Sequence, residues 1–120
     1  MSKIIKTKPE VIQNMAGGPG YITRYSMIES NGDIYNSGRL YAHIVIEKDC
    51  GVGYHVHQGD GEIYYILKGE GEYNDNGNLV TVKPGDVTHT RPGEGHGITN
   101  RKDEPLEMMA LILFEKQKEA

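Results

Sequence analysis

Short apolar runs separated by turn-forming residues dominate the chain, and several of these runs alternate with polar positions. A period of two is typical of β-strands, because successive side chains of a strand point to opposite faces. Asn76-Gly77 lies between two runs and favours a tight hairpin, since both residues tolerate positive φ. We predict strands over residues 21–28, 39–48, 54–57, 62–68, 69–73, 79–83, 87–90, 96–100 and 105–115, with a polar loop at 29–38 and a turn at 49–53.

Eight to ten short strands without a long helical pattern predict an all-β protein. Sandwiches, jelly rolls and small barrels share this pattern. The chain has 120 residues, which fits one domain with a modest core. Residues 1–20 carry little regular pattern and are expected to lead into a β-barrel domain over 21–115, followed by a fraying tail over 116–120.

Two of the predicted strands are apolar on both faces. In strand 62–68 one face carries Glu62, Tyr64 and Ile66, and the other carries Ile63, Tyr65 and Leu67. In strand 105–115 the two sets are Met108, Ala110, Ile112 and Phe114 against Met109, Leu111 and Leu113. A strand that is apolar on both faces is covered on both faces. The core supplies one cover, and we expect a second layer or a partner subunit, most simply in a homodimer, to supply the other.

The charge of the chain argues against several kinds of partner. The net charge is −4 and no basic block stands out, so we expect neither nucleic acid nor a membrane surface as a partner. Cys50 is the single cysteine, which excludes an intramolecular disulfide and suits a reducing compartment. The first residues lack the apolar run of a signal peptide, and the longest apolar run, 108–114, is too short to span a membrane. We therefore expect a cytoplasmic protein.

Candidate metal ligands lie close together in the centre of the chain. His55 and His57 are two residues apart, so on a strand they project to the same side with Cα atoms roughly 7 Å apart. The turn around Gly59 lets the chain reverse, so that Glu62 opens the next strand and can face the same interior. With His96, this set offers three imidazoles and one carboxylate, which suit a divalent transition metal rather than calcium or magnesium.

With these residues and the strand pattern, the chain resembles the cupin superfamily. The first cupin motif is matched by the set His55, His57, Glu62 and Gly69. The second is matched by the set Gly85, Gly93, His96 and Asn100. Two positions depart from the pattern: Asp49 stands where the first motif opens with glycine, and the proline of the second motif is displaced by one, to Pro92.

The resemblance implies a single-domain cupin-type jelly-roll β-barrel with a metal ion inside its open end. It also implies metal ligation by His55, His57, Glu62 and His96, and frequent homodimers. Some small bacterial cupins with segments similar to residues 62–69 and 84–87 of this chain carry an oxalate-decarboxylase label. The expected ion is one divalent transition metal, with Mn, Fe, Ni or Co favoured and Zn also compatible.

Other polar residues are candidates for chemistry or for plain structural roles. Tyr64 shares a face with Glu62 and can act as an acid, a base or a hydrogen-bond donor, or it can be a core tyrosine. His43 can line the cavity or lie at the barrel wall. His89 is either a surface residue or a neighbour of the ligands, and Arg24 and Arg39 are either anion anchors or surface residues.

The ligand set predicts a metal-dependent enzyme acting on a small carboxylate or carbonyl compound, by decarboxylation, isomerisation or oxygenation. Four protein ligands on an octahedral ion leave two adjacent positions, which favour a bidentate carboxylate. The alternative is a non-catalytic module that binds or senses a small organic acid or sugar. A sensor domain of a transcription factor is a third reading, weakened because no DNA-binding segment accompanies the barrel.

Overall fold

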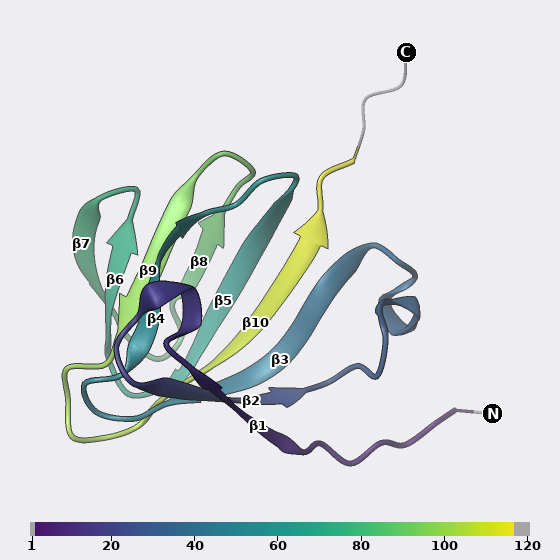
Figure 1. Cartoon of the computed structure of the whole chain (residues 1–120), viewed down its shortest axis with the longest axis horizontal. Helices are drawn as coiled ribbons and strands as arrows, with labels where there is room; N and C mark the ends of the chain where they lie inside the picture. Colours follow the sequence, from purple (N-terminus) through teal and green to yellow (C-terminus); the bar gives the residue numbers. More distant parts are fainter. Residues whose placement is uncertain (1, 117–120) are drawn as a thin grey trace.

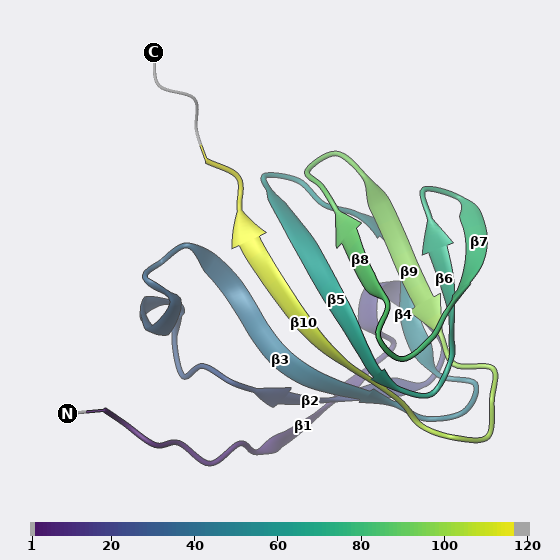
Figure 2. The ribbon, with the colours of Figure 1, turned by 180° about the vertical axis from the view of Figure 1, so that it is seen from behind.

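The structure is a computed structural model that describes residues 2–116. Ten strands and two short 3-10 helices lie within these residues (Figures 1 and 2). The strands are β1 (Pro9–Gln13), β2 (Tyr21–Ser26), β3 (Gly38–Ile46), β4 (Gly51–Val56), β5 (Asp60–Lys68), β6 (Gly71–Asp75), β7 (Asn78–Val82), β8 (Val87–Thr90), β9 (Gly95–Thr99) and β10 (Leu106–Phe114). The helices are η1 (Met15–Gly17) and η2 (Asn31–Ile34).

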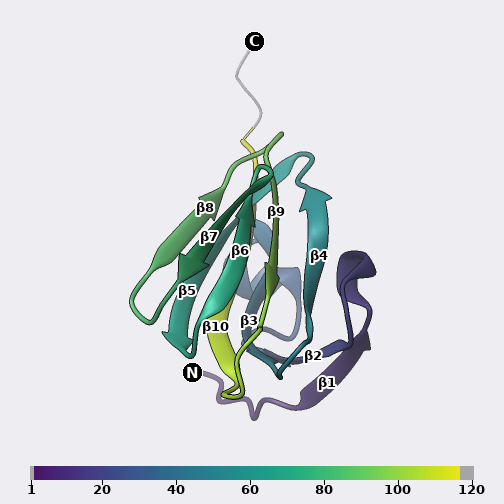
Figure 3. The same cartoon turned by 90° about the vertical axis from the view of Figure 1, so that its left-hand side faces the viewer.

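The strands form two antiparallel sheets that face each other (Figure 3). The larger sheet has the order β1-β2-β3-β10-β5-β8, and the smaller has the order β4-β9-β6-β7. Neighbours in each sheet are mostly distant in sequence, as a jelly roll requires. The prediction of an all-β jelly roll is therefore confirmed. No helix within residues 2–116 is long and apolar enough to cross a membrane.

The core lies between the two sheets and is built from one face of each central strand. Its β5 side chains include Tyr64 and Ile66, which are 2% and 0% exposed, as parity with Glu62 predicted. From β3 and β10 it takes Ala42, Ile44, Ile46, Met108, Ala110 and Ile112. The smaller sheet contributes Val52, Tyr73, Val82 and Ile98. Phe114 was expected to share this face, but it is exposed at the end of β10.

Between residues 1 and 20 the structure differs from the prediction. No regular element was expected there, yet β1 pairs with β2 along its whole length, from Pro9↔Tyr25 to Gln13↔Tyr21. The strand escaped prediction because it is an edge strand with nearly all of its residues exposed, so no apolar alternation marks it. Of the expected tail, 116–120, only Lys116 falls within the described residues.

Glycines explain a second difference, at the start of β4. The segment 49–53 was predicted to be a turn, but β4 already begins at Gly51. A Cβ atom on Gly53 would lie 2.1 Å from the carbonyl oxygen of Ala16, in η1. Glycine is therefore needed for the close approach of η1 to β4, which places η1 beside this strand.

The hairpin prediction is confirmed. Asp75 ends β6 and Asn78 begins β7, so Asn76 and Gly77 form a two-residue loop. Both loop residues have positive φ, 50° and 95°. This is the backbone that a two-residue turn between twisted antiparallel strands requires.

Candidate metal centre

Four predicted ligands converge inside the barrel, three from strands of both sheets and one from the residue that follows β4. His55 lies in β4, His57 follows directly after β4, and His96 lies opposite His55 in β9. Glu62 is on β5, in the larger sheet, and its side chain faces inward with Tyr64. The jelly-roll order therefore joins residues that the sequence separates widely.

The ligand atoms of these four residues all lie within 4.8 Å of one another. His57 Nε2 is 3.2 Å from Glu62 Oε1 and 3.1 Å from His96 Nε2, which is 3.0 Å from the same carboxylate oxygen. Two ligands that bind one ion at right angles, each at about 2.1 Å, lie about 3 Å apart. His57, Glu62 and His96 are buried. The cluster fits a divalent metal ion in both chemistry and size.

Each histidine holds its other ring nitrogen in a hydrogen bond. Nδ1 of His55 lies 2.8 Å from the carbonyl oxygen of Gly53, to which it donates. Nδ1 of His57 lies 2.6 Å from Asp60 Oδ1, and Nδ1 of His96 lies 2.8 Å from Thr90 Oγ1. A histidine that donates from Nδ1 presents the lone pair of Nε2. All three Nε2 atoms are thereby available to bind one ion.

A chain of charged groups supports His57 from outside the cluster. Arg39 Nε donates to Asp60 Oδ2 at 2.8 Å, and the other oxygen of Asp60 accepts from His57. Asp60 is buried, whereas half of the Arg39 side chain is exposed. The carboxylate fixes the ring of His57 and makes it a better electron donor, and Arg39 neutralises that carboxylate.

The charges around the cluster favour a cation. Burial alone would raise the pKa of the Glu62 carboxyl, but contacts with His57 and His96 hold this pKa below its usual value. Glu62, and then Asp60, raise the pKa of His57 against the effect of burial. Burial lowers the pKa of His55, and the neighbouring imidazoles lower it further. The ionised Glu62 therefore faces imidazoles that a metal ion can take over from a proton.

A cavity of about 130 Å³ opens onto the cluster. Its floor contains His55, His57 and Glu62, and Met15 and Ala16 of η1 lie at its wall. The other lining residues are mostly apolar, with two arginines among them: Ile22, Arg24, Arg39, Leu40, Ile44, Val52, Tyr64 and Ile112. The cavity is small and mostly apolar, and each of its two arginines is paired with a carboxylate, Arg24 with Glu10 and Arg39 with Asp60.

Tyr64 lies in this cavity, with its ring stacked on His96 at a centroid distance of 4.9 Å. Burial, and then the negative charge of Glu62, raise the pKa of Tyr64 well above its usual value. The phenol therefore stays protonated at neutral pH. It can donate a hydrogen bond to a bound molecule, but it is not a base.

The structure separates His43 from the candidate ligands. It lies on the outer face of β3, because Tyr41, His43 and Val45 alternate with the buried Ala42, Ile44 and Ile46 and point away from the core. Its Nε2 lies 2.9 Å from Glu107 Oε1 and its ring stacks on Tyr25. The interpretation of His43 as a residue that lines the cavity and takes part in chemistry is wrong for this reason.

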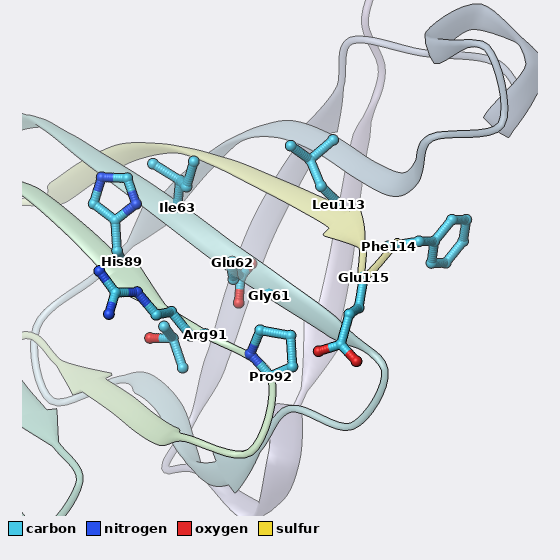
Figure 4. A pocket seen from close by; sticks show the side chains of 10 residues that line it. Gly61, Glu62, Ile63, His89, Arg91, Pro92, Leu113, Phe114 and Glu115 are labelled. Atoms are coloured by element: carbon cyan, nitrogen blue, oxygen red, sulfur yellow. The ribbon is translucent and has the colours of Figure 1, made fainter. Parts of the chain in front are cut away.

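His89 also lies outside, at a second hollow of about 290 Å³ on the outer side of β5, β8 and β10 (Figure 4). Ile63, Leu113, Phe114 and Pro92 line this hollow beside it. The backbone register explains the placement: His89 pairs with Ile63, whereas its neighbour Thr90 pairs with Glu62 and faces inward.

Three residues around the cluster escaped the sequence reasoning. From the sequence Asp60 is only part of the turn, although a carboxylate is a common partner of the second ring nitrogen of a metal-ligating histidine. Tyr73 and Thr90 reach Nδ1 of His96 at 3.1 and 2.8 Å. Only the pairing of β6 with β9 and of β5 with β8 places these two hydroxyls there, so no local pattern reveals them.

Comparison with known proteins agrees with this geometry. Residues 42–112 match the protein family described as Cupin domain. The chain is 42% identical over 106 residues to the oxalate-binding protein of Thermotoga maritima, which covers 88% of this chain and 87% of that protein. Three glycines of this chain match the cupin motifs: Gly69 in the first motif, and Gly85 and Gly93 in the second. All three have positive φ.

Solved structures show the same fold. A predicted oxalate decarboxylase from Thermotoga maritima has a TM-score of 0.88 at 41% identity, over 92% of this chain and 95% of that chain. The cupin domain of Schizosaccharomyces pombe Cnp3 has a TM-score of 0.70 at 13% identity, over 88% and 69%. A cupin 2 conserved barrel domain protein from Salinispora arenicola has a TM-score of 0.65 at 23% identity, over 77% and 75%. The last two show a shared fold alone.

Proposed function

The chain belongs to the cupin family, and we propose that it binds one divalent transition-metal ion and acts through it on a small carboxylate or carbonyl compound. The observation that carries this proposal is the cluster of His55, His57, Glu62 and His96, of which the last three are buried and the first three line a small cavity. The remaining walls are mostly apolar, so electrostatic interactions inside are weakly screened by water.

The ion is Mn, Fe, Ni or Co in this proposal. Three imidazole nitrogens and one carboxylate oxygen suit these metals, and an octahedral shell keeps two positions for other ligands. Zn is compatible with the same donors, but it prefers four ligands in total. When bound, the ion would supply a Lewis acid that stabilises negative charge developing on a substrate oxygen.

The size and charge of the cavity point to the substrate class. A cavity of about 150 Å³ is known to hold a molecule of six carbon atoms, and this cavity is about 130 Å³. Oxalate and pyruvate, which also have about six non-hydrogen atoms each, are of this size. Both can chelate through two oxygens, and the relative from Thermotoga maritima is called an oxalate-binding protein.

The residues around the cavity have distinct roles in the proposed reaction. The apolar walls exclude water, and the divalent ion supplies the positive charge that attracts an anion. Arg39 holds Asp60, whereas the exposed pair of Arg24 with Glu10 is free to open toward an anion. Tyr64 donates a hydrogen bond to the bound molecule from its protonated phenol, while Asp60 holds His57 in position. Decarboxylation, isomerisation and oxygenation all build negative charge on an oxygen, which these groups favour.

A non-catalytic binding module remains the second candidate, and one observation favours it. Among the described residues that line the cavity, Glu62 is the sole carboxylate, and it belongs to the ligand set. Tyr64 stays protonated, so the cavity holds no free base for a proton-transfer step. Binding of a small acid without turnover needs no such base.

Calorimetry with oxalate and with pyruvate tests the proposal, on protein loaded with Mn²⁺ and on chelator-treated protein. We expect binding to the loaded protein and far weaker binding to the treated protein. Equal binding to both forms, or no binding to the loaded form at millimolar ligand, would refute the proposal. Release of carbon dioxide from bound oxalate then separates an enzyme from a binding module.

We also propose that the chain forms a homodimer through the outer face of the larger sheet. This apolar outer face consists of Tyr41, Ile63, Tyr65, Leu67, Met109, Leu111 and Leu113. Leu111 pairs with Tyr41 on one side and with Ile63 on the other, so the apolar side chains are contiguous. A self-complementary apolar patch is most simply covered by a second copy. The buried free thiol of Cys50 supports a reducing, cytoplasmic location.

A further inference from the structure

Arg24 lies on the inner side of the larger sheet, where charged residues are rare. It follows Ile22 by two residues in β2 and pairs with Ile44 of β3, and both of these isoleucines belong to the core. Its side chain is only 27% exposed and lines the cavity that the metal cluster closes at its floor. The Arg24 side chain therefore borders the same cavity as the candidate ligands His55, His57 and Glu62.

The partner of Arg24 is a single carboxylate from the edge of the sheet. Arg24 Nε donates to Glu10 Oε1 at 2.9 Å, and its Nη2 donates to the same oxygen. Glu10 lies directly opposite in β1, its side chain is 60% exposed, and within residues 2–116 it has no other ion-pair partner. An exposed pair of this kind contributes little stability, typically below about 1 kcal/mol.

Arg39, the second guanidinium of the cavity, is held quite differently. Its partner Asp60 is buried and also accepts a hydrogen bond from His57. If Arg39 moved away, the carboxylate that orients this candidate metal ligand would lose its cation. Arg24 is not held in this way, because the exposed side chain of Glu10 can turn into solvent. Of the two arginines, Arg24 is the one free to exchange its carboxylate for another.

We propose that Arg24 determines specificity for the substrate carboxylate: it releases Glu10 and binds carboxylate oxygens of the molecule held at the metal. This inference rests on the proposed function, since it presumes a small anion in the cavity. The planar fork of a guanidinium matches a carboxylate with two parallel hydrogen bonds. Glu10 then occupies the place of the substrate carboxylate in the free protein and competes with it.

A purely structural ion pair makes a different prediction. Breaking such a pair from either side would have the same consequence, a small loss of stability and no change in ligand binding. A recognition residue with an internal competitor gives effects of opposite sign. Loss of Arg24 weakens binding, whereas loss of the Glu10 charge strengthens it.

The test compares Arg24→Gln, Arg24→Lys and Glu10→Gln with the parent, all loaded with Mn²⁺ and titrated with oxalate by calorimetry. We expect Arg24→Gln to weaken oxalate binding by about 10- to 100-fold, the value of a hydrogen bond between charged groups. Arg24→Lys should recover part of this loss, because it keeps the charge but not the fork. Glu10→Gln should bind oxalate up to about fivefold more tightly. Bound manganese per chain should be the same in all four proteins.

Arg101→Gln is the matched control, because Arg101 forms an exposed ion pair with Glu72 and does not line the cavity. It should bind oxalate like the parent. If the parent binds oxalate and Arg24→Gln binds it equally well, or if both substitutions at the pair act in the same direction, the inference is overturned and the proposed function stands. If the loaded parent binds neither oxalate nor pyruvate, the proposed function fails and this inference fails with it.

Discussion

Nε2 of His57 lies 3.1 Å from Nε2 of His96, although 39 residues separate the two in the chain. Nδ1 of His57 is held by Asp60 and Nδ1 of His96 by Thr90, and in the tautomers in which both Nδ1 atoms donate, two nitrogen lone pairs face each other across this distance. Two lone pairs repel unless a cation or a proton lies near both. Glu62 Oε1 completes a triangle with the two nitrogens, at 3.2 and 3.0 Å. The fold holds these three atoms in an arrangement that a metal ion stabilises.

Removal of either histidine should abolish metal binding. In His57→Ala and His96→Ala the ion loses one of four protein ligands, so we expect elemental analysis to find little metal per chain. His89→Ala is the control, because His89 lies on the outer side of the sheet and should leave the metal content unchanged. Full metal stoichiometry in both ligand variants would contradict the assignment of the cluster.

Removal of the metal should destabilise the fold. An ion that binds the folded state alone, at a hundred times its dissociation constant, adds about 2.7 kcal/mol to the free energy of unfolding. For a chain of 120 residues this corresponds to a fall in Tm of about 10 °C when a chelator removes the ion. Differential scanning calorimetry with and without chelator measures the shift. A chelator that strips the ion without moving Tm would argue against a site formed by folding.

Asp60→Asn should weaken metal binding without removing a ligand. The amide cannot accept from His57 and pair with Arg39 as the carboxylate does, so the His57 ring loses its orientation and part of its basicity. Loss of such a partner costs typically about 10- to 100-fold in metal affinity. Competition with a chromophoric chelator measures the affinity.

The control for this substitution is Asp103→Asn, since Asp103 is an exposed carboxylate whose partner is Lys48. It should bind metal as the parent does. Equal affinities in the two variants would show that Asp60 does not support the ion.

A charge on the apolar outer face should prevent dimer formation. Light scattering at micromolar concentration is expected to give the mass of a dimer for the parent and of a monomer for Tyr65→Lys. Tyr65 is 46% exposed in the single chain, so a lysine there is tolerated by the fold but costs heavily when a second copy covers it. Val80→Lys, at a similarly exposed position on the smaller sheet, should stay dimeric. A parent that scatters as a monomer would refute the homodimer.

The sequence by itself determined the all-β class, the Asn76-Gly77 hairpin and the four candidate ligands. These features depend on local rules. Side-chain alternation sets the face of Glu62, Tyr64 and Ile66, and the φ tolerance of Asn and Gly sets the turn. Residue type and spacing indicated the pair His55 and His57, because imidazoles two apart on an extended chain project together. The resemblance to the cupin motifs implied the full set with Glu62 and His96.

Only the tertiary structure decided what surrounds those ligands. The outward face of His43, the edge strand β1, and the contacts of Tyr73 and Thr90 with His96 depend on which strands pair and in which register. Pairing between distant segments is governed by burial of the whole core, and it leaves no periodic trace in any one segment. For the same reason Arg24 could be read from the sequence as either an anion anchor or a surface residue, until β2 placed it over the cavity.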